Sequence, residues 1–257
     1  MQKGQADSGS RIPIVGPKLV QEALRSHLIV EEVYLCASRA QESELEAIRK
    51  KTVDVGANVW LVADRVYRSL VDTETPQGVV AMVKLPKFQL DQVARDSSFL
   101  ILADQLQDPG NLGTLVRSAE AFGAKAILLT ENTVSPANQK VVRASAGSLF
   151  RIPILTGFKL PRLLDDLHER AFMLAATVPR GGQDFRHVDY RGPTALVVGN
   201  EGSGLSSSAL ERIRLRVTIP LSANVESLNV AVASSIIFSE VARQRGISAV
   251  KSEGTMG

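Results

Sequence analysis

Three polar stretches of the chain carry side chains that could bind and orient a polar ligand. Residues 104–123 supply amide and guanidinium groups, residues 199–204 supply a carboxylate between glycines, and residues 219–243 supply a hydroxyl and an amide. This set includes neither a thiol nor a cluster of metal ligands. It is typical of group transfer from a reactive cofactor, in which positioning of the substrate supplies much of the catalysis.

The candidate catalytic side chains are those of Asn111, Arg117, Glu201, Ser227 and Asn229. Asn111 is expected to be the N-cap of the helix that carries Arg117, and Ser227 is expected to begin the last helix. A guanidinium beside the end of an apolar strand can bind a phosphate or a polarised hydroxyl. Each stretch alone also has an ordinary explanation: a solvated helix face, a tight strand-to-helix turn, or a helix cap.

Apolar runs alternate with helical patterns through residues 97–247, which predicts an α/β domain with a parallel sheet. The run at 99–103 is apolar throughout, as in a strand that is covered on both faces. Ligands bind beyond the carboxyl ends of such strands, so the three polar stretches are expected to share one pocket. The predicted strands are 99–103, 126–129, 151–155, 172–177, 194–198 and 217–220, and the predicted later helices are 138–144, 161–170, 206–212 and 227–245.

Residues 11–86 predict a smaller α/β unit, followed by a linker at 87–96 that Pro86 introduces. Residues 1–10 and 248–257 are polar and predict flexible tails, and the first of them lacks the apolar core of a signal peptide. The predicted elements of the unit are a helix that begins near Pro17, strands at 32–37, 59–63 and 79–83, helices at 43–50 and 66–72, and a turn at 75–78.

Composition narrows the class of protein. The 257 residues are 44% hydrophobic, and no apolar run approaches the ~20 residues of a membrane helix. Cys36 is the only cysteine, which predicts a buried thiol and a cytoplasmic location. His27, His168 and His187 are isolated, so no metal is expected. A net charge of +3 is compatible with RNA, whereas 5% aromatic residues argue against a base-stacking platform.

Three motifs follow one another at compatible spacing over residues 97–246. The first is Asn111, then Arg117 six residues later, with Gly123 closing the helix; the second is LVVGNEG at 196–202; the third is IPL at 219–221 followed by SLNVAVA at 227–233. Together they resemble the motifs of the SpoU-type (TrmH-like) RNA ribose 2′-O-methyltransferases of the SPOUT class. Through GPKLVQEAL and TETPQGVVAMV, residues 11–86 are similar to the accessory substrate-binding domain of that family, a ribosomal-protein-like RNA-binding fold.

This resemblance implies a deep trefoil knot in the C-terminal domain, although knots are otherwise essentially absent from proteins. Periodicity alone predicts a plain doubly wound sheet. The knot is implied to form a pocket for S-adenosyl-L-methionine, and the family is homodimeric with its active site near the subunit interface. The implied cofactor contacts are Thr177, Gly199, Asn200, Gly202, Ile219, Leu221 and Leu228.

The resemblance also implies roles for the catalytic candidates. A guanidinium stays protonated at neutral pH and is a poor base, so Arg117 is expected to bind the ribose hydroxyl and the adjacent phosphate. Glu201 is expected to hold Arg or Asn side chains in place, while the other catalytic candidates orient the hydroxyl or the loops. Arg143 is either an RNA phosphate contact or an ordinary surface residue.

The expected function is S-adenosylmethionine-dependent methylation of a ribose 2′-hydroxyl in structured RNA, most simply 23S-type ribosomal RNA. Three alternatives stay open at this stage. One is methylation of a tRNA ribose, and another is a non-catalytic RNA-binding protein on the same scaffold. The third is self-protection against a ribosome-targeting antibiotic, which uses the same chemistry.

Overall fold

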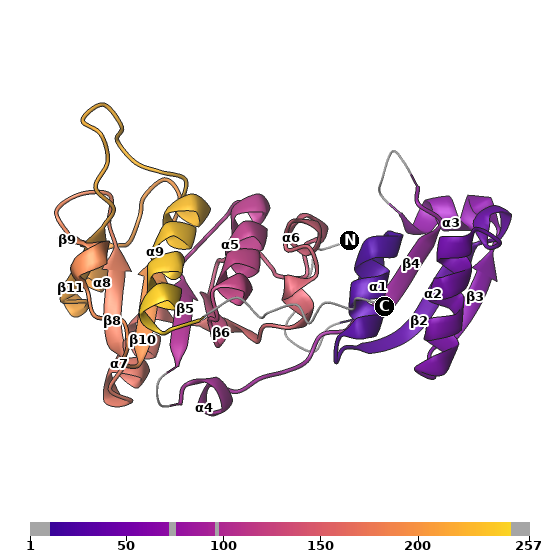
Figure 1. Cartoon of the computed structure of the whole chain (residues 1–257), viewed down its shortest axis with the longest axis horizontal. Coiled ribbons are helices and arrows are strands. Elements are labelled where there is room, and N and C mark those ends of the chain that lie inside the picture. The colour runs from indigo at the N-terminus through magenta and orange to yellow at the C-terminus, as the bar shows by residue number, and fades with distance from the viewer. Residues whose placement is uncertain (1–10, 72–75, 96–97, 248–257) are drawn as a thin grey trace, which may run out of the picture.

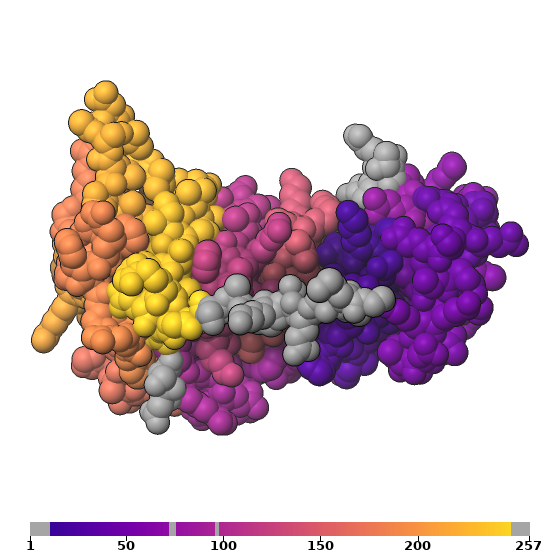
Figure 2. All heavy atoms as spheres, viewed as in Figure 1, coloured from indigo at the N-terminus to yellow at the C-terminus, as the bar shows by residue number. Residues whose placement is uncertain are grey.

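The computed structural model describes residues 11–71, 76–95 and 98–247, which form two β-sheets (Figure 1). Residues 11–84 build the smaller sheet and residues 99–218 the larger one. The predicted tails at 1–10 and 248–257, and Thr75 of the predicted turn, lie outside the described residues. Figure 2 shows the two units in direct contact near the middle of an elongated molecule.

The first unit consists of β1 (Arg11–Val15), α1 (Pro17–Arg25), β2 (Ile29–Cys36), α2 (Ser43–Asp54), β3 (Asn58–Val62), α3 (Asp64–Leu70) and β4 (Val79–Lys84). Its sheet has the order β1-β4-β2-β3, and β2 runs parallel to β3. Strand β1 was not predicted, because Pro13 weakens a strand pattern. The structure places β1 at the sheet edge, where a proline is tolerated. Cys36 is buried, as predicted.

The second unit consists of α4 (Leu90–Val93), β5 (Phe99–Ala103), α5 (Pro109–Ala121), β6 (Ala126–Thr130), α6 (Gln139–Ala144), β7 (Ile154–Phe158), α7 (Leu160–Glu169), β8 (Met173–Thr177), β9 (Gln183–Asp184), β10 (Thr194–Val198), α8 (Ser207–Arg212), β11 (Leu215–Thr218) and α9 (Val230–Gln244). The strand pairs are parallel, which confirms the predicted fold class. The two-residue strand β9 is too short to leave a pattern and was missed. Strand β7 begins three residues later than predicted, after a short 3₁₀ turn at Ser148–Phe150.

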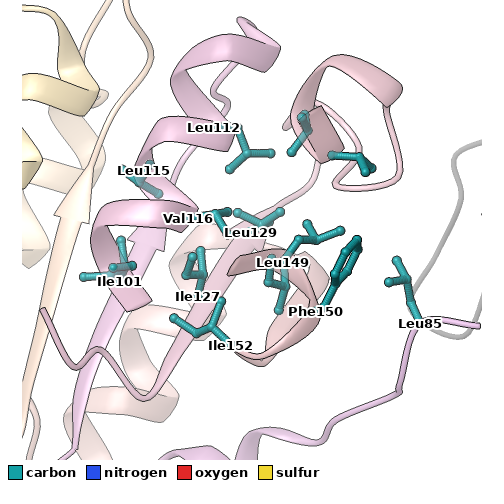
Figure 3. Packing of buried hydrophobic residues seen from close by; sticks show 14 of the residues in the cluster. Leu85, Ile101, Leu112, Leu115, Val116, Ile127, Leu129, Leu149, Phe150 and Ile152 are labelled. Carbon is teal, nitrogen blue, oxygen red and sulfur yellow. The ribbon is translucent and has the colours of Figure 1, made fainter. Parts of the chain in front are cut away.

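Helices cover both faces of the larger sheet, because the sides of the fully buried strand β5 alternate between two cores. Ile101 packs in the core that contains α5 and α9, whereas Leu102 packs in the core that contains α7 and α8. Figure 3 shows the first of these cores, where Leu115 and Val116 of α5 lie near Ile101. The sheet is therefore the middle of three layers, and its strand ends are left for a site.

In the larger sheet, with the strand order β7-β6-β5-β10-β8-β11-β9, some neighbouring strands are not consecutive in the chain and are joined by crossover connections. β8 precedes β10 in the chain, yet β10 lies between β5 and β8 and pairs with both. The loops after β8, β10 and β11 are therefore brought to one end of the sheet. The trefoil knot that the resemblance implies stays a prediction.

The predicted linker is packed rather than free. It contains α4, whose Val93 is buried in the core beneath α7.

The two units also meet directly, because the Arg151 guanidinium contacts the carboxylates of Glu22 at 2.7 Å and Glu120 at 2.5 Å. The Gln139 amide donates to the Pro13 carbonyl at 2.8 Å. In the described part of the chain, no helix is long and apolar enough to cross a membrane.

Candidate active site

A cavity of about 580 Å³ lies at the carboxyl ends of β8, β10 and β11. The loop at 219–229, which projects at the upper left of Figure 2, contributes to its wall. The three polar stretches meet here, as their spacing predicted. The predicted residues that line the cavity are Asn111, Thr177, Gly199, Asn200, Glu201, Gly202, Ile219, Leu221, Ser227, Leu228 and Asn229.

A chain of hydrogen bonds joins one residue from each of the three stretches. The Asn111 amide nitrogen donates to the Glu201 carboxylate at 3.1 Å. The Asn229 amide nitrogen in turn donates to the Asn111 amide oxygen at 2.8 Å. Because Asn111 donates to Glu201 and accepts from Asn229, these two partners fix the orientation of its amide.

Two predicted helix caps were wrong, and the corrections explain why these amides are available. Helix α5 is capped by Asp108, whose carboxylate accepts from the Asn111 backbone N–H at 2.8 Å. Pro109 in the first turn was the signal for this start. Helix α9 begins after Asn229, not at Ser227, and the Asn229 amide oxygen accepts from the Ala231 N–H at 2.9 Å. Asn229 therefore caps α9 and holds Asn111 at once.

Glu201 is held by backbone as well as by side chain. Its two oxygens accept from the backbone N–H groups of Gln107 and Asp108, each at 3.1 Å, next to the start of α5. Burial works against ionisation, but these bonds and that from Asn111 outweigh it and lower the pKa of Glu201. The carboxylate is therefore ionised at neutral pH and serves as an anchor. Sequence reasoning missed the Gln107 and Asp108 donors, since a backbone N–H leaves no residue-type signal.

The glycine-rich loop at 199–204 is shaped by Asn200. Its amide oxygen accepts from the N–H groups of Gly202 at 2.9 Å and Ser203 at 3.1 Å, and its amide nitrogen donates to the Gln105 carbonyl at 2.8 Å. Gly199 has no room for a side chain, because a Cβ there would lie 2.5 Å from the Leu205 backbone nitrogen. The two ends of the loop are thus packed tightly against each other.

Two family models match the chain. The model of the SpoU rRNA Methylase family matches residues 98–239, and the RNA 2′-O ribose methyltransferase substrate binding model matches residues 13–89. The chain belongs to the SpoU rRNA methylase family. The SpoU match covers all three motifs and the whole wall of the cavity.

Relatives of the chain cover most of its length. It is 34% identical over 224 residues to the 23S rRNA (guanosine(2553)-2′-O)-methyltransferase RlmP of Bacillus subtilis, covering 87% of this chain and 85% of that protein. The SpoU methyltransferase AviRb from Streptomyces viridochromogenes, solved in complex with the cofactor AdoMet, superposes with a TM-score of 0.82 at 27% identity, over 91% and 90% of the two chains. An AdoMet-bound rRNA methyltransferase from Sinorhizobium meliloti gives 0.78 at 30% identity, over 91% and 87%.

Two of the predicted site residues, Arg117 and Arg143, do not line this cavity. Arg117 is exposed on α5 and does not line it, because the step of six residues from Asn111 to Arg117 leaves the two side chains about 120° apart around the helix. Within the described residues the Arg117 guanidinium has no hydrogen-bond or ion-pair partner. Ser118, next to it, accepts from the Ser235 hydroxyl at 2.7 Å where α5 packs on α9. Arg143 is exposed on α6.

Several lining residues were not predicted. Val178 and Pro179 follow β8 directly, so their position at a strand end was the available signal. Ala233 and Ile237 come from α9, one turn apart on the face turned to the cavity. The described residues contain no group of three or more His, Cys, Asp or Glu side chains that could hold a metal ion.

Proposed function

We propose that this protein transfers a methyl group from S-adenosyl-L-methionine to a ribose 2′-hydroxyl of ribosomal RNA of the 23S type. The observation that carries the proposal is the cavity in which the Glu201–Asn111–Asn229 chain meets the glycine-rich loop. RlmP is named for this chemistry, and the substrate-binding match at 13–89 supports an RNA substrate. Action on ribosomal RNA would place the protein in the cytoplasm.

The residues of the cavity fit this cofactor. A volume of about 580 Å³ lies within the ~300–1,000 Å³ range of small-molecule sites. The apolar side chains of Ile219, Leu221 and Leu228 offer contact to an adenine ring, while the glycine-rich backbone can approach the ligand closely. We propose that Thr177, Gly199, Asn200 and Gly202 contribute the remaining contacts.

When bound, S-adenosylmethionine supplies a methyl group already activated on a sulfonium, so this chain must orient the acceptor. We propose that Asn111 and Asn229, fixed by Glu201, orient the ribose hydroxyl, with Ser227 at the exposed edge of the cavity. Arg117 would bind that hydroxyl and the adjacent phosphate, and Arg143 would bind a phosphate further along. The proton would pass to a phosphate oxygen or a neighbouring group, because a guanidinium is a poor base.

A homodimer forms part of the proposal. Arg117 lies outside the cavity of its own chain, and Val232 of α9 is 47% exposed although it sits in an apolar helix. Pairing of two chains along α9 would cover Val232 and bring two active sites near the interface. Sedimentation velocity at micromolar concentration measures the mass that this pairing predicts.

The close fit of Gly199 predicts the effect of a single methyl group. Gly199→Ala would push a Cβ against the backbone of residues 204 and 205, and is expected to cost about 1–3 kcal/mol and to weaken cofactor binding at least tenfold. Gly192→Ala is the matched control, since no atom would lie within 4 Å of its Cβ and the residue does not line the cavity. Calorimetric titration with S-adenosylmethionine compares them. Equal affinities for the two variants would place the cofactor elsewhere.

Labelled methyl transfer to purified rRNA and tRNA tests the function. We expect the label in rRNA, on a ribose that resists alkaline hydrolysis on its 3′ side. Label in a base would contradict the mechanism, and label in tRNA alone would favour the tRNA alternative. Failure of calorimetry to detect cofactor binding would leave the non-catalytic RNA-binding alternative.

A further inference from the structure

A second cavity, of about 400 Å³, lies beside the first one at the carboxyl ends of β5 and β6. Its walls come from the ends of these strands, from the start of α7 and from α8. None of the motifs assigned above accounts for it. The residues that matter here are Asp104, Gln105, Asn132, Phe158, Lys159 and Arg212.

The walls of the second cavity differ in polarity and charge. The strand ends contribute hydrogen-bonding groups, including the carboxylate of Asp104, which is only 4% exposed and accepts from the Thr130 hydroxyl at 2.8 Å. The end of β7, with Phe158, and the start of α7 contribute an apolar surface. Lys159 and Arg212 add two cations at the rim, and the Arg212 guanidinium is also paired with the Asp165 carboxylate at 2.7 Å. The exposed carboxylate of Glu131 lines the same cavity. A planar base with polar edges and an attached phosphate needs these three kinds of contact.

The second cavity shares its framework with the active site. Gln105 lines the second cavity, and its carbonyl accepts from Asn200 of the first cavity at 2.8 Å. The Gln107 side chain donates to the Asn132 carbonyl, while the Gln107 backbone N–H donates to Glu201 at 3.1 Å. A ligand bound here would therefore lie against the loop that holds the catalytic residues.

We propose that the second cavity binds a nucleotide of the substrate RNA that flanks the methylated one. Its phosphate contacts Lys159 and Arg212, and its base packs on Phe158 with its edge toward Asn132. The proposal rests on the RNA methylation proposed above. Through the second cavity the enzyme would recognise the RNA sequence next to its target nucleotide, at a site separate from the cofactor.

Lys159→Ala tests the phosphate contact, and Arg162→Ala is its matched control. Arg162 lies in the first turn of α7, which follows Lys159 directly, has a side chain that is 86% exposed, and does not line the cavity. With an rRNA fragment that carries the mapped target, Lys159→Ala is expected to raise the KM for RNA about fivefold to tenfold and to lower the salt slope of RNA binding by about 1. Affinity for S-adenosylmethionine should be unchanged in both variants.

Asn132→Gly tests the base contact without straining the backbone. Asn132 has a φ of +64°, which glycine adopts freely, and the carbonyl that Gln107 contacts is retained. An abasic site placed next to the target nucleotide, on one side or the other, is expected to weaken RNA binding to the wild type severalfold. The same abasic site should have a smaller effect on Asn132→Gly, because the edge contact is already lost and only the packing on Phe158 remains to be removed.

The two proposals fail in different ways. If the wild type methylates the fragment but Lys159→Ala and Arg162→Ala behave alike, or every abasic effect adds fully to that of Asn132→Gly, the flanking-nucleotide site is wrong and the function stands. If the wild type transfers no methyl group, the function is wrong. Binding of purified rRNA to the wild type, Lys159→Ala and Arg162→Ala, measured by filter retention, then decides on the cavity without any turnover.

Discussion

Arg117→Ala is expected to lose methyl transfer by about 10²-fold or more while S-adenosylmethionine binds with unchanged affinity. The structure separates these two effects. Arg117 is exposed on α5 and does not line the cavity, so its removal leaves the cavity wall intact. A side chain with no hydrogen-bond or ion-pair partner in the described part of the chain is available to RNA. The loss should therefore appear in single-turnover transfer and in RNA affinity.

Arg117→Lys distinguishes charge from geometry. A lysine keeps the positive charge but not the planar, two-pronged donor set, so a partial rescue of RNA binding with little rescue of the transfer rate is expected. Calorimetric titration with the cofactor is the control for folding of the cavity. If Arg117→Ala abolished cofactor binding, Arg117 would be a structural or cofactor residue, and the proposed role would be wrong.

The convergence of the three motifs was predictable from sequence, because the carboxyl ends of parallel strands share one edge of a sheet. Strands β5 and β10 were placed at their true bounds, since each is an uninterrupted apolar run between polar turns. Helix starts were less predictable. Asn111 and Ser227 are both good caps by residue type, but Asp108 and Asn229 occupy the cap positions.

What the sequence could not show is how the motifs hold one another. The bond from Asn229 to Asn111 joins residues 118 positions apart, and the backbone donors to Glu201 come from a turn with no diagnostic residue. The second cavity was also invisible to sequence reasoning. Its walls come from four separate segments, and its polar groups, such as Asn132 and Lys159, look like ordinary loop residues when taken singly.

Glu201→Gln is expected to lower kcat about 30- to 100-fold, with at most a small effect on cofactor affinity. The substitution keeps the shape but replaces one acceptor oxygen with a donor. One oxygen of Glu201 accepts from Asn111 and the Asp108 N–H, and the other accepts from the Gln107 N–H. Whichever way the new amide turns, its NH₂ group would face an N–H donor. The Asn111 amide would then lose its fixed orientation.

The difference in stability between the wild type and Glu201→Gln should depend on pH in a defined direction. The pKa of Glu201 is lowered in the folded protein from its ordinary value of 4.5, so the wild type gains stability above about pH 4.5 and loses that gain as the pH falls through the folded-state pKa. The difference in melting temperature between wild type and Glu201→Gln should therefore shrink in acid. Glu211→Gln, at an exposed carboxylate on α8, is the matched control for the loss of one negative charge.

A double-mutant cycle decides whether Glu201 acts through Asn111. If the carboxylate only positions the amide, Glu201→Gln should cost much less in an Asn111→Ala background than in the wild type. Fully additive losses would mean that Glu201 touches the substrate itself, as a base or a ligand to the ribose. The geometry favours the first outcome, because both carboxylate oxygens already accept hydrogen bonds from the start of α5, and Asn111 passes the constraint on to Asn229.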